Sequence, residues 1–276
     1  MIKQIYIHPL AWFVVFIAVA TGLFRHLILL AVIIFVHEWG HYIMARFFNW
    51  RIRRVVLLPF GGVLEVDEHG NRPFKEEFLV VLFGPVQHVW LTGVGLIFFH
   101  FELWSHSTLE TFLFYNTTIF IFNLLPIWPL DGGKLLFLLF AYFQPFKKAH
   151  LQTLGASMLF LVIFSAICIV VFQIYLNLAL ILLFLLFSIY TEYRHHYYVF
   201  LRFLLERLEQ RRKAKREKFL PVHSNEKVEN IFKSFYKGAN HVIVFRFHFK
   251  DERELLEAYF VHKKVNATVS QLFRLE

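Results

Sequence analysis

The stretch AVIIFVHEWGHYIMARFF, Ala31 to Phe48, decides the fold. It is almost continuously apolar, yet two histidines and a glutamate lie in its middle. An unpaired charged side chain at the centre of a membrane helix costs roughly 2.5–3.5 kcal/mol on insertion scales. Ionisable groups placed there against that cost indicate a functional site inside a membrane segment, because a bound metal ion would recover the cost.

The composition around this stretch is that of a membrane protein. The chain has 276 residues, of which 58% are hydrophobic and 36 are phenylalanine, and the apolar residues fill positions 8 to 190. A helix needs about 20 apolar residues to cross a bilayer. Six segments are predicted to do so: Pro9–Phe24, Leu27–Phe47, Phe78–Phe99, Thr111–Trp128, Leu151–Phe172 and Tyr175–Tyr190.

The basic residues predict the orientation of these spans. With the N-terminus inside, the only basic residue of the outside loops is Arg25. The inside loops hold Lys3, Arg46, Arg51, Arg53, Arg54, Arg72, Lys75, Lys134, Lys147 and Lys148, and the remaining 18 basic residues follow Thr191. Cytosolic loops carry such an excess, so both termini are predicted in the cytosol. The same placement explains the net charge of +9 without nucleic-acid binding.

The motif His37-Glu38-Trp39-Gly40-His41 reads H-E-x-x-H. On a helix, residues four apart share a face, so His37 and His41 can bind one ion while Glu38 carries a proton. Neutral imidazole is a good zinc ligand and a carboxylate can act as general base. Isolated matches to this motif often bind nothing, but the apolar surroundings favour metal binding here.

A catalytic zinc ion needs a third protein ligand. Asp131 is the candidate, in FNLLPIWPLDGGKLLF, Phe122 to Phe137, where two prolines end the fourth span and two glycines are predicted to let the backbone turn. Both motifs lie toward the cytosolic ends of spans that run the same way, so they should share a depth. Alone, Asp131 would be read as a turn or helix-cap residue. The single cysteine, Cys168, excludes an internal disulfide and a cysteine-ligated metal site.

Between the second and third spans lies RVVLLPFGGVLEVDE, Arg54 to Glu68. β-Branched residues around Gly61-Gly62 predict a small membrane-embedded hairpin with its turn at the two glycines; a loop with an amphipathic anchor is the equal alternative. An edge strand over Val63, Leu64, Glu65 and Val66 would hold a peptide substrate extended. Phe60 is predicted either to gate entry or simply to pack.

The last third of the chain predicts a basic linker helix over residues 191–219 and a small soluble α/β domain over 220–276. Within that domain, NEKVENIFKSFYKG favours a helix, HVIVFRF a strand and ERELLEAYFVHK a second helix. So short a unit has a marginal core, which favours pairing with a second copy.

These motifs together carry a family resemblance. The sequences HEWGH, Gly84-Pro85 and NLLPIWPLDGG resemble those of the site-2 protease family of intramembrane zinc metalloproteases, over essentially the whole chain. The resemblance implies a polytopic α-helical membrane protein whose residues 1–190 form the protease domain. It implies one zinc ion held by His37, His41 and Asp131, with Glu38 as general base and acid. Asn123 would stabilise the substrate carbonyl.

The resemblance also implies a biological setting. The substrate would be a membrane-associated sigma-factor precursor, pro-sigma-K, cleaved in the mother cell during sporulation, and two inhibitory membrane proteins would be partners. The C-terminal domain resembles a single CBS domain, whose family binds adenine nucleotides and pairs. ATP sensing and a purely structural pairing role both remain open, and no residue is assigned to ATP.

One departure and two competing functions remain at this stage. The family usually has a small residue or asparagine after Gly-Pro, where this chain has Gln87 and His88, so their role is open; His88 is expected to be a packed core histidine rather than a further ligand.

The first competing function is a membrane-anchored zincin of the prenyl-protease type, which would take its third ligand from a later glutamate. A channel or transporter with a regulatory domain would bind no stoichiometric zinc.

Overall fold

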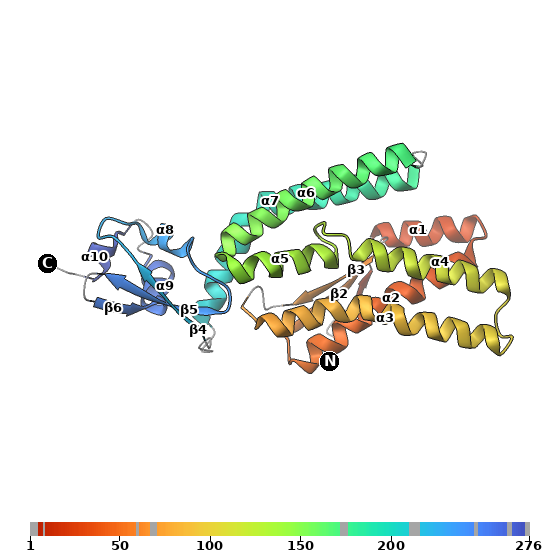
Figure 1. Ribbon diagram of the computed structural model, residues 1–276, viewed down its shortest axis with the longest axis horizontal. Helices are drawn as coiled ribbons and strands as arrows, with labels where there is room; N and C mark the ends of the chain where they lie inside the picture. Colours follow the sequence, from red (N-terminus) through yellow and green to blue (C-terminus); the bar gives the residue numbers. More distant parts are fainter. Residues whose placement is uncertain are drawn as a thin grey trace.

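The computed structural model describes residues 5–7, 9–58, 61–66, 71–171, 176–209, 216–245, 248–263 and 267–273. Its helices form an elongated body with a small α/β unit at one end, next to the C-terminus (Figure 1). Phe60, predicted either to gate entry or to pack, lies outside the described residues.

Four of the described helices are long and apolar enough to cross a membrane: α2 (Phe24–Phe47), α3 (Phe74–His100), α6 (Phe146–Val171) and α7 (Leu176–Glu209). Two further helices match predicted spans, α1 (Pro9–Ala20) and α4 (His106–Asn123). At 1.5 Å per residue, α1 is about 18 Å long and falls short of a bilayer core of about 30 Å. The six-span arrangement therefore stays a prediction.

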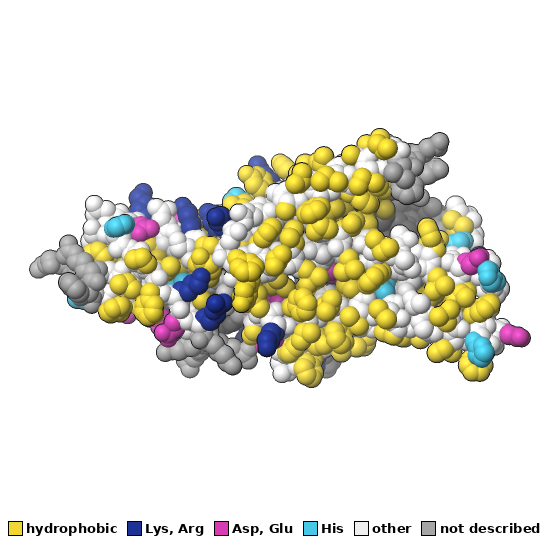
Figure 2. All heavy atoms as spheres, viewed as in Figure 1, with side chains coloured by type: hydrophobic (Ala, Val, Ile, Leu, Met, Phe, Trp, Pro, Cys, Tyr) yellow, Lys and Arg dark blue, Asp and Glu magenta, His cyan; other side chains and the backbone are white. Residues whose placement is uncertain are grey.

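The surface of the helical body is strongly apolar. Figure 2 shows hydrophobic side chains over most of the helices, while Lys and Arg gather beside the C-terminal unit on the face shown. Large apolar side chains more than half exposed to solvent include Phe47, Val89, Phe114 and Val170. A soluble monomer rarely exposes so much contiguous apolar surface, and lipid is the environment that suits it.

Two strands between α2 and α3 form a three-stranded sheet with a short strand from the start of the chain. β2 (Ile52–Leu58) pairs antiparallel with β3 (Gly61–Val66), and β1 (Ile5–Ile7) adds to the other edge of β2 in parallel. The predicted turn at Gly61-Gly62 is wrong, because these residues pair with Leu58 and Leu57 as strand residues. The lack of a side chain at Gly62 serves a close approach to Glu38 of α2 instead. The strand β1 has no counterpart in the sequence prediction, since three residues carry too short a pattern.

The segment after α4 also differs from the prediction. Asp131 is not in a turn but is the first residue of a helix, α5 (Asp131–Phe143). Gly132 and Gly133 are helical, and a Cβ at either one would overlap backbone atoms of the preceding loop. The two glycines thus let the start of α5 pack tightly against residues 124–128.

The C-terminal unit is built from β4 (Arg216–Pro221), α8 (Val228–Phe232), β5 (Ala239–Phe245), β6 (His248–Asp251), α9 (Glu252–Phe260) and α10 (Val269–Phe273). β4 pairs in parallel with β5, and β6 pairs antiparallel with it on the other side. The helix predicted over residues 191–219 is too long, because Arg216–Pro221 form the strand β4; the described part of α7 reaches Glu209.

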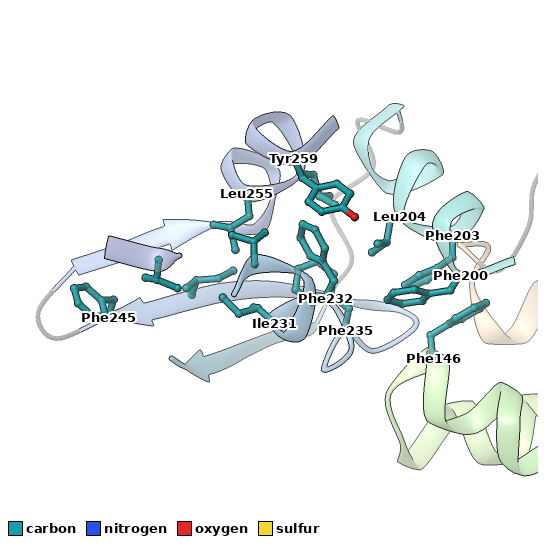
Figure 3. Close-up of a cluster of buried hydrophobic side chains, with 14 residues drawn as sticks. Phe146, Phe200, Phe203, Leu204, Ile231, Phe232, Phe235, Phe245, Leu255 and Tyr259 are labelled. Carbon is teal, nitrogen blue, oxygen red and sulfur yellow. The ribbon is translucent and has the colours of Figure 1, made fainter. Parts of the chain in front are cut away.

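This unit shares its core with the membrane helices. α7 is one helix of about 51 Å, from the last predicted span into the C-terminal unit. Figure 3 shows Phe200, Phe203 and Leu204 of α7, with Phe146 of α6, against Phe235 and other buried side chains of the unit. Arg207 also forms a buried ion pair with Glu252, with 2.7 Å between Nη2 and Oε1.

Candidate metal centre

Two imidazoles from α2 converge in the interior. His37 and His41 are both buried, and their Nε2 atoms lie 3.1 Å apart. The i, i+4 spacing places the two side chains one turn apart on the same face of the helix. That face meets α3 at Gly84, where a Cβ would overlap the His41 ring. A glycine at this position is what gives the imidazole its room.

Asp131 reaches the same point from the start of α5. Its side chain is only 3% exposed, and Oδ2 lies 3.1 Å from Nε2 of each histidine. The other oxygen, Oδ1, accepts a hydrogen bond of 3.0 Å from Lys134, one turn further along α5. Lys134 therefore holds the carboxylate so that one oxygen faces the imidazoles.

The three atoms make a triangle that suits zinc. Tetrahedral coordination with bonds of about 2.0–2.1 Å separates neighbouring ligand atoms by about 3.3 Å. The three observed separations are all 3.1 Å. Two imidazole nitrogens and one carboxylate oxygen are also the ligand types of catalytic zinc sites, which leave the fourth position open. The residues present fit a zinc ion.

Both histidines have a partner for the ring nitrogen that does not face the triangle. Nδ1 of His41 donates to the backbone carbonyl of Val80 at 2.7 Å. Nδ1 of His37 lies 3.0 Å from Nε2 of His88. Such contacts fix the tautomer of a ligating imidazole and the direction of its ring.

Glu38 stands next to this cluster and is held by the sheet. Its carboxylate is grouped with the nitrogens of His37 and His41 within 4.8 Å. Oε1 accepts a 3.0 Å hydrogen bond from the backbone N–H of Gly62 in β3. A Cβ at Gly62 would overlap the Glu38 side chain, so the strand can come this close only because glycine is there.

Comparisons with known proteins agree with this geometry. The profile of Peptidase family M50 matches residues 25–106 and 100–166. Stage IV sporulation protein FB of Bacillus subtilis is 41% identical over 99% of this chain and 96% of its own length. The chain belongs to peptidase family M50, the site-2 proteases.

Two further likenesses come from an archaeon. A zinc metalloprotease of Methanocaldococcus jannaschii is 33% identical over 40% of this chain and 32% of its own length. The solved structure of the site-2 protease of the same organism aligns with a TM-score of 0.55 at 23% identity, covering 67% of this chain and 88% of that one. As a member of the M50 family, the chain is an intramembrane zinc metalloendopeptidase.

Asn123 is not brought into the cluster by the contacts of the described residues. It is the last residue of α4, and its side-chain N–H donates to the Ile119 carbonyl at 3.1 Å. One of the two hydrogens on this amide nitrogen is thus used within its own helix.

The remaining predicted residues are Gln87, His88 and the strand Val63–Val66. Gln87 donates to the Phe83 carbonyl at 3.0 Å, outside the metal cluster. His88 is buried beside His37, so its role in this site-2 protease is set by that contact. The residues from Val63 to Val66 are described as a strand paired with β2, and their side chains lie outside the description.

Several groups of the site were missed from the sequence. Lys134 follows Asp131 by three residues, a spacing that pairs side chains only if a helix begins at Asp131. The Val80 carbonyl and the Gly62 amide are backbone groups and carry no residue signal. Of the two backbone groups, only the amide of Gly62 belongs to a residue that the sequence pattern singles out, and there the pattern predicted a turn.

Proposed function

We propose that this site-2 protease acts in sporulation and cleaves a membrane-associated sigma-factor precursor, pro-sigma-K. The observation that carries the proposal is the triangle of 3.1 Å between His37, His41 and Asp131, with Glu38 beside it. The likeness over nearly the whole chain to stage IV sporulation protein FB supports the substrate and the setting. Two inhibitory sporulation membrane proteins are proposed partners.

The chemistry divides among the residues of the site. His37, His41 and Asp131 would hold the ion. A bound zinc ion supplies Lewis acidity: it polarises a carbonyl and lowers the pKa of a coordinated water. Glu38, steadied by the Gly62 amide, takes the proton from the attacking water and later delivers it to the leaving amine. Asn123, released from Ile119, would donate its N–H to the developing oxyanion.

The sheet offers a place for an extended substrate. In the strand order β1-β2-β3, β2 is paired on both sides, so β1 and β3 are the edge strands. β3 is also the strand that contacts Glu38. A peptide added along Val63–Val66 would place its backbone beside the proton carrier, in the manner of strand addition. Proline replacements over Val63–Val66 should reduce cleavage and leave zinc content unchanged; loss of zinc as well would mean that the fold had failed.

The membrane arrangement follows from length and charge. We propose six crossings, by α1, α2, α3, α4, α6 and α7, with both termini in the cytosol of the mother cell. The concentration of Lys and Arg next to the C-terminal unit supports this orientation (Figure 2).

The C-terminal unit is proposed to be a CBS-like regulatory domain. The order β4, α8, β5, β6, α9 and the small shared core support it. Adenine nucleotide binding and pairing with a second copy follow from that likeness, and no individual residue is assigned to ATP.

Co-expression with pro-sigma-K tests the proposal. Wild type, Glu38→Gln and Asp131→Ala are compared for processing of the precursor and for zinc content after purification. Processing should stop in both variants, while zinc should survive the first change and weaken with the second. Processing by Glu38→Gln, or a wild-type protein without stoichiometric zinc, would refute the proposed mechanism.

A further inference from the structure

A third buried histidine links the metal centre to α4. His88 of α3 is 2% exposed, and its two ring nitrogens contact side chains on opposite sides. Nε2 lies 3.0 Å from Nδ1 of His37 on α2, and Nδ1 lies 2.7 Å from Oδ1 of Asn116 on α4. Asn116 is equally buried, at 2%. Three helices are thus joined by a row of hydrogen bonds that ends on a predicted zinc ligand.

The direction of every hydrogen in this row can be worked out from one backbone carbonyl. The carbonyl oxygen of His88 can only accept, and Nδ2 of Asn116 lies 2.9 Å from it, so this end of the amide must be the nitrogen. The same nitrogen lies 3.0 Å from Oγ1 of Thr92, which accepts from it while donating to the His88 carbonyl. The amide oxygen of Asn116 is therefore the atom that faces the His88 ring.

From there the tautomers follow one after the other. An amide oxygen only accepts, so Nδ1 of His88 must carry the hydrogen that it donates to Asn116. A neutral imidazole carries one N–H, which leaves Nε2 of His88 as an acceptor. His37 then donates from Nδ1, and its Nε2 keeps a free lone pair. That atom is the one that faces His41 and Asp131.

We propose that His88 and Asn116 are positioning residues for zinc: they fix the tautomer and the ring direction of His37. The inference rests on the proposed metal centre. His88 itself is no ligand in this arrangement, because the two nitrogens of an imidazole point away from each other and His88 lies on the side of His37 remote from the triangle. It takes the place that a carboxylate or carbonyl usually holds behind a metal-bound histidine.

The two ligating histidines differ in what supports them. Nδ1 of His41 donates to a backbone carbonyl, that of Val80, which a side-chain substitution does not remove. The ring of His37 is held by the side chain of His88, which is held in turn by the side chain of Asn116. Outer partners of this kind contribute about 10–100-fold to metal affinity. Substitutions behind His37 should therefore weaken zinc binding by that factor, whether or not the enzyme is active.

The experiment measures zinc affinity on the purified full-length protein, by competition with a chelating fluorophore, in wild type and four variants. His88→Leu removes both hydrogen bonds of the ring. Asn116→Leu leaves His88 in place but frees it to carry its hydrogen on Nε2, which would turn His37 into the tautomer that cannot bind. His88→Gln offers an oxygen to His37 and an N–H to Asn116, and should restore most of the affinity.

The matched control uses a hydrogen bond between α2 and α4, the two outer helices of the three that the row joins. Nδ1 of His26 lies 2.8 Å from the hydroxyl of Tyr115, the residue before Asn116. Tyr115→Phe removes that bond without touching the row behind His37. Zinc affinity should fall about 10–100-fold in both leucine variants and stay at the wild-type value in Tyr115→Phe.

Cobalt in place of zinc gives a second readout, because its visible absorption reports ligand geometry. The spectrum should change in the two leucine variants and return toward wild type in His88→Gln. Wild-type zinc affinity in folded Asn116→Leu, or an equal loss in Tyr115→Phe, would overturn the inference. If His88→Leu does not fold, Asn116→Leu alone tests the inference, because it keeps the His88 imidazole in place. A wild-type protein that binds no zinc would refute the proposed function instead.

Discussion

Gly84→Ala should abolish high-affinity zinc binding by adding a single methyl group. Gly84 lies in the middle of α3, where this helix crosses α2 at the two ligand histidines. The new Cβ would overlap the ring of His41 and lie 2.9 Å from Cε1 of His37. Carbon atoms in ordinary contact are about 3.5–4.0 Å apart. The rings or the helix must therefore move.

The size of that movement decides the outcome. Relieving the overlap requires a shift of about 1 Å, whereas metal–ligand distances tolerate about 0.2 Å. Zinc affinity should fall at least ~100-fold, the upper end of what the loss of one outer partner costs. The fold should lose only about 1–3 kcal/mol, as is usual for one overpacked methyl group. Gly84→Ala should thus lose high-affinity zinc binding while the protein still folds.

Gly93→Ala is the matched control. It lies on the same helix, and a Cβ there has nothing within 4 Å. It should keep full zinc content and gain up to about 1 kcal/mol from the better helix propensity of alanine. Zinc per chain is measured by atomic emission on detergent-purified protein, and stability by thermal unfolding. Wild-type zinc affinity in folded Gly84→Ala would show that the close approach of α3 does not position the histidines.

Three further predictions follow from other contacts. Arg207→Met should weaken the C-terminal unit by about 3–5 kcal/mol in chemical denaturation, because it leaves the Glu252 carboxylate buried without its guanidinium partner; an unchanged midpoint would contradict the importance of this pair. Burial lowers the pKa of His241, so the unit should lose stability as the pH falls below about 6.5, and His241→Asn should flatten that profile. Gly62→Ala should displace the Glu38 carboxylate and reduce precursor cleavage with zinc content unchanged, and full activity would argue against the role of β3.

The two histidines proposed as metal ligands stand out in the sequence because their signal is local. Two histidines four residues apart on an apolar helix need no knowledge of the rest of the chain. Asp131 was reached by a weaker argument, the shared depth of two segments, and the structure places its carboxylate 3.1 Å from both imidazoles. The helix that begins at Asp131 was missed, because two glycines suggest a turn unless the backbone against which they pack is known.

Contacts between distant parts of the chain could not be predicted from the sequence. Lys237 of the C-terminal unit forms a buried ion pair with Glu77 in the first turn of α3, 160 residues away. A lysine in a charged domain is normally a surface residue, and nothing near it in the sequence marks it as buried. For Asn123 the family motif predicts a site residue, and the structure shows its amide donating to its own helix, so its role in catalysis stays a prediction.

The helix α3 explains why the metal centre and the C-terminal unit belong to one structure. Glu77 in its first turn pairs with Lys237, whose pKa is lowered by burial although the carboxylate opposes that shift. One turn later the Val80 carbonyl accepts from His41, and two turns after that His88 accepts from His37. At 1.5 Å per residue these contacts span about 16 Å of one helix. A helix fixed at its N-terminal end by a buried ion pair cannot slide or rotate without moving the partners of both histidines. The docking of the C-terminal unit therefore helps to hold the ligands in place before any metal binds.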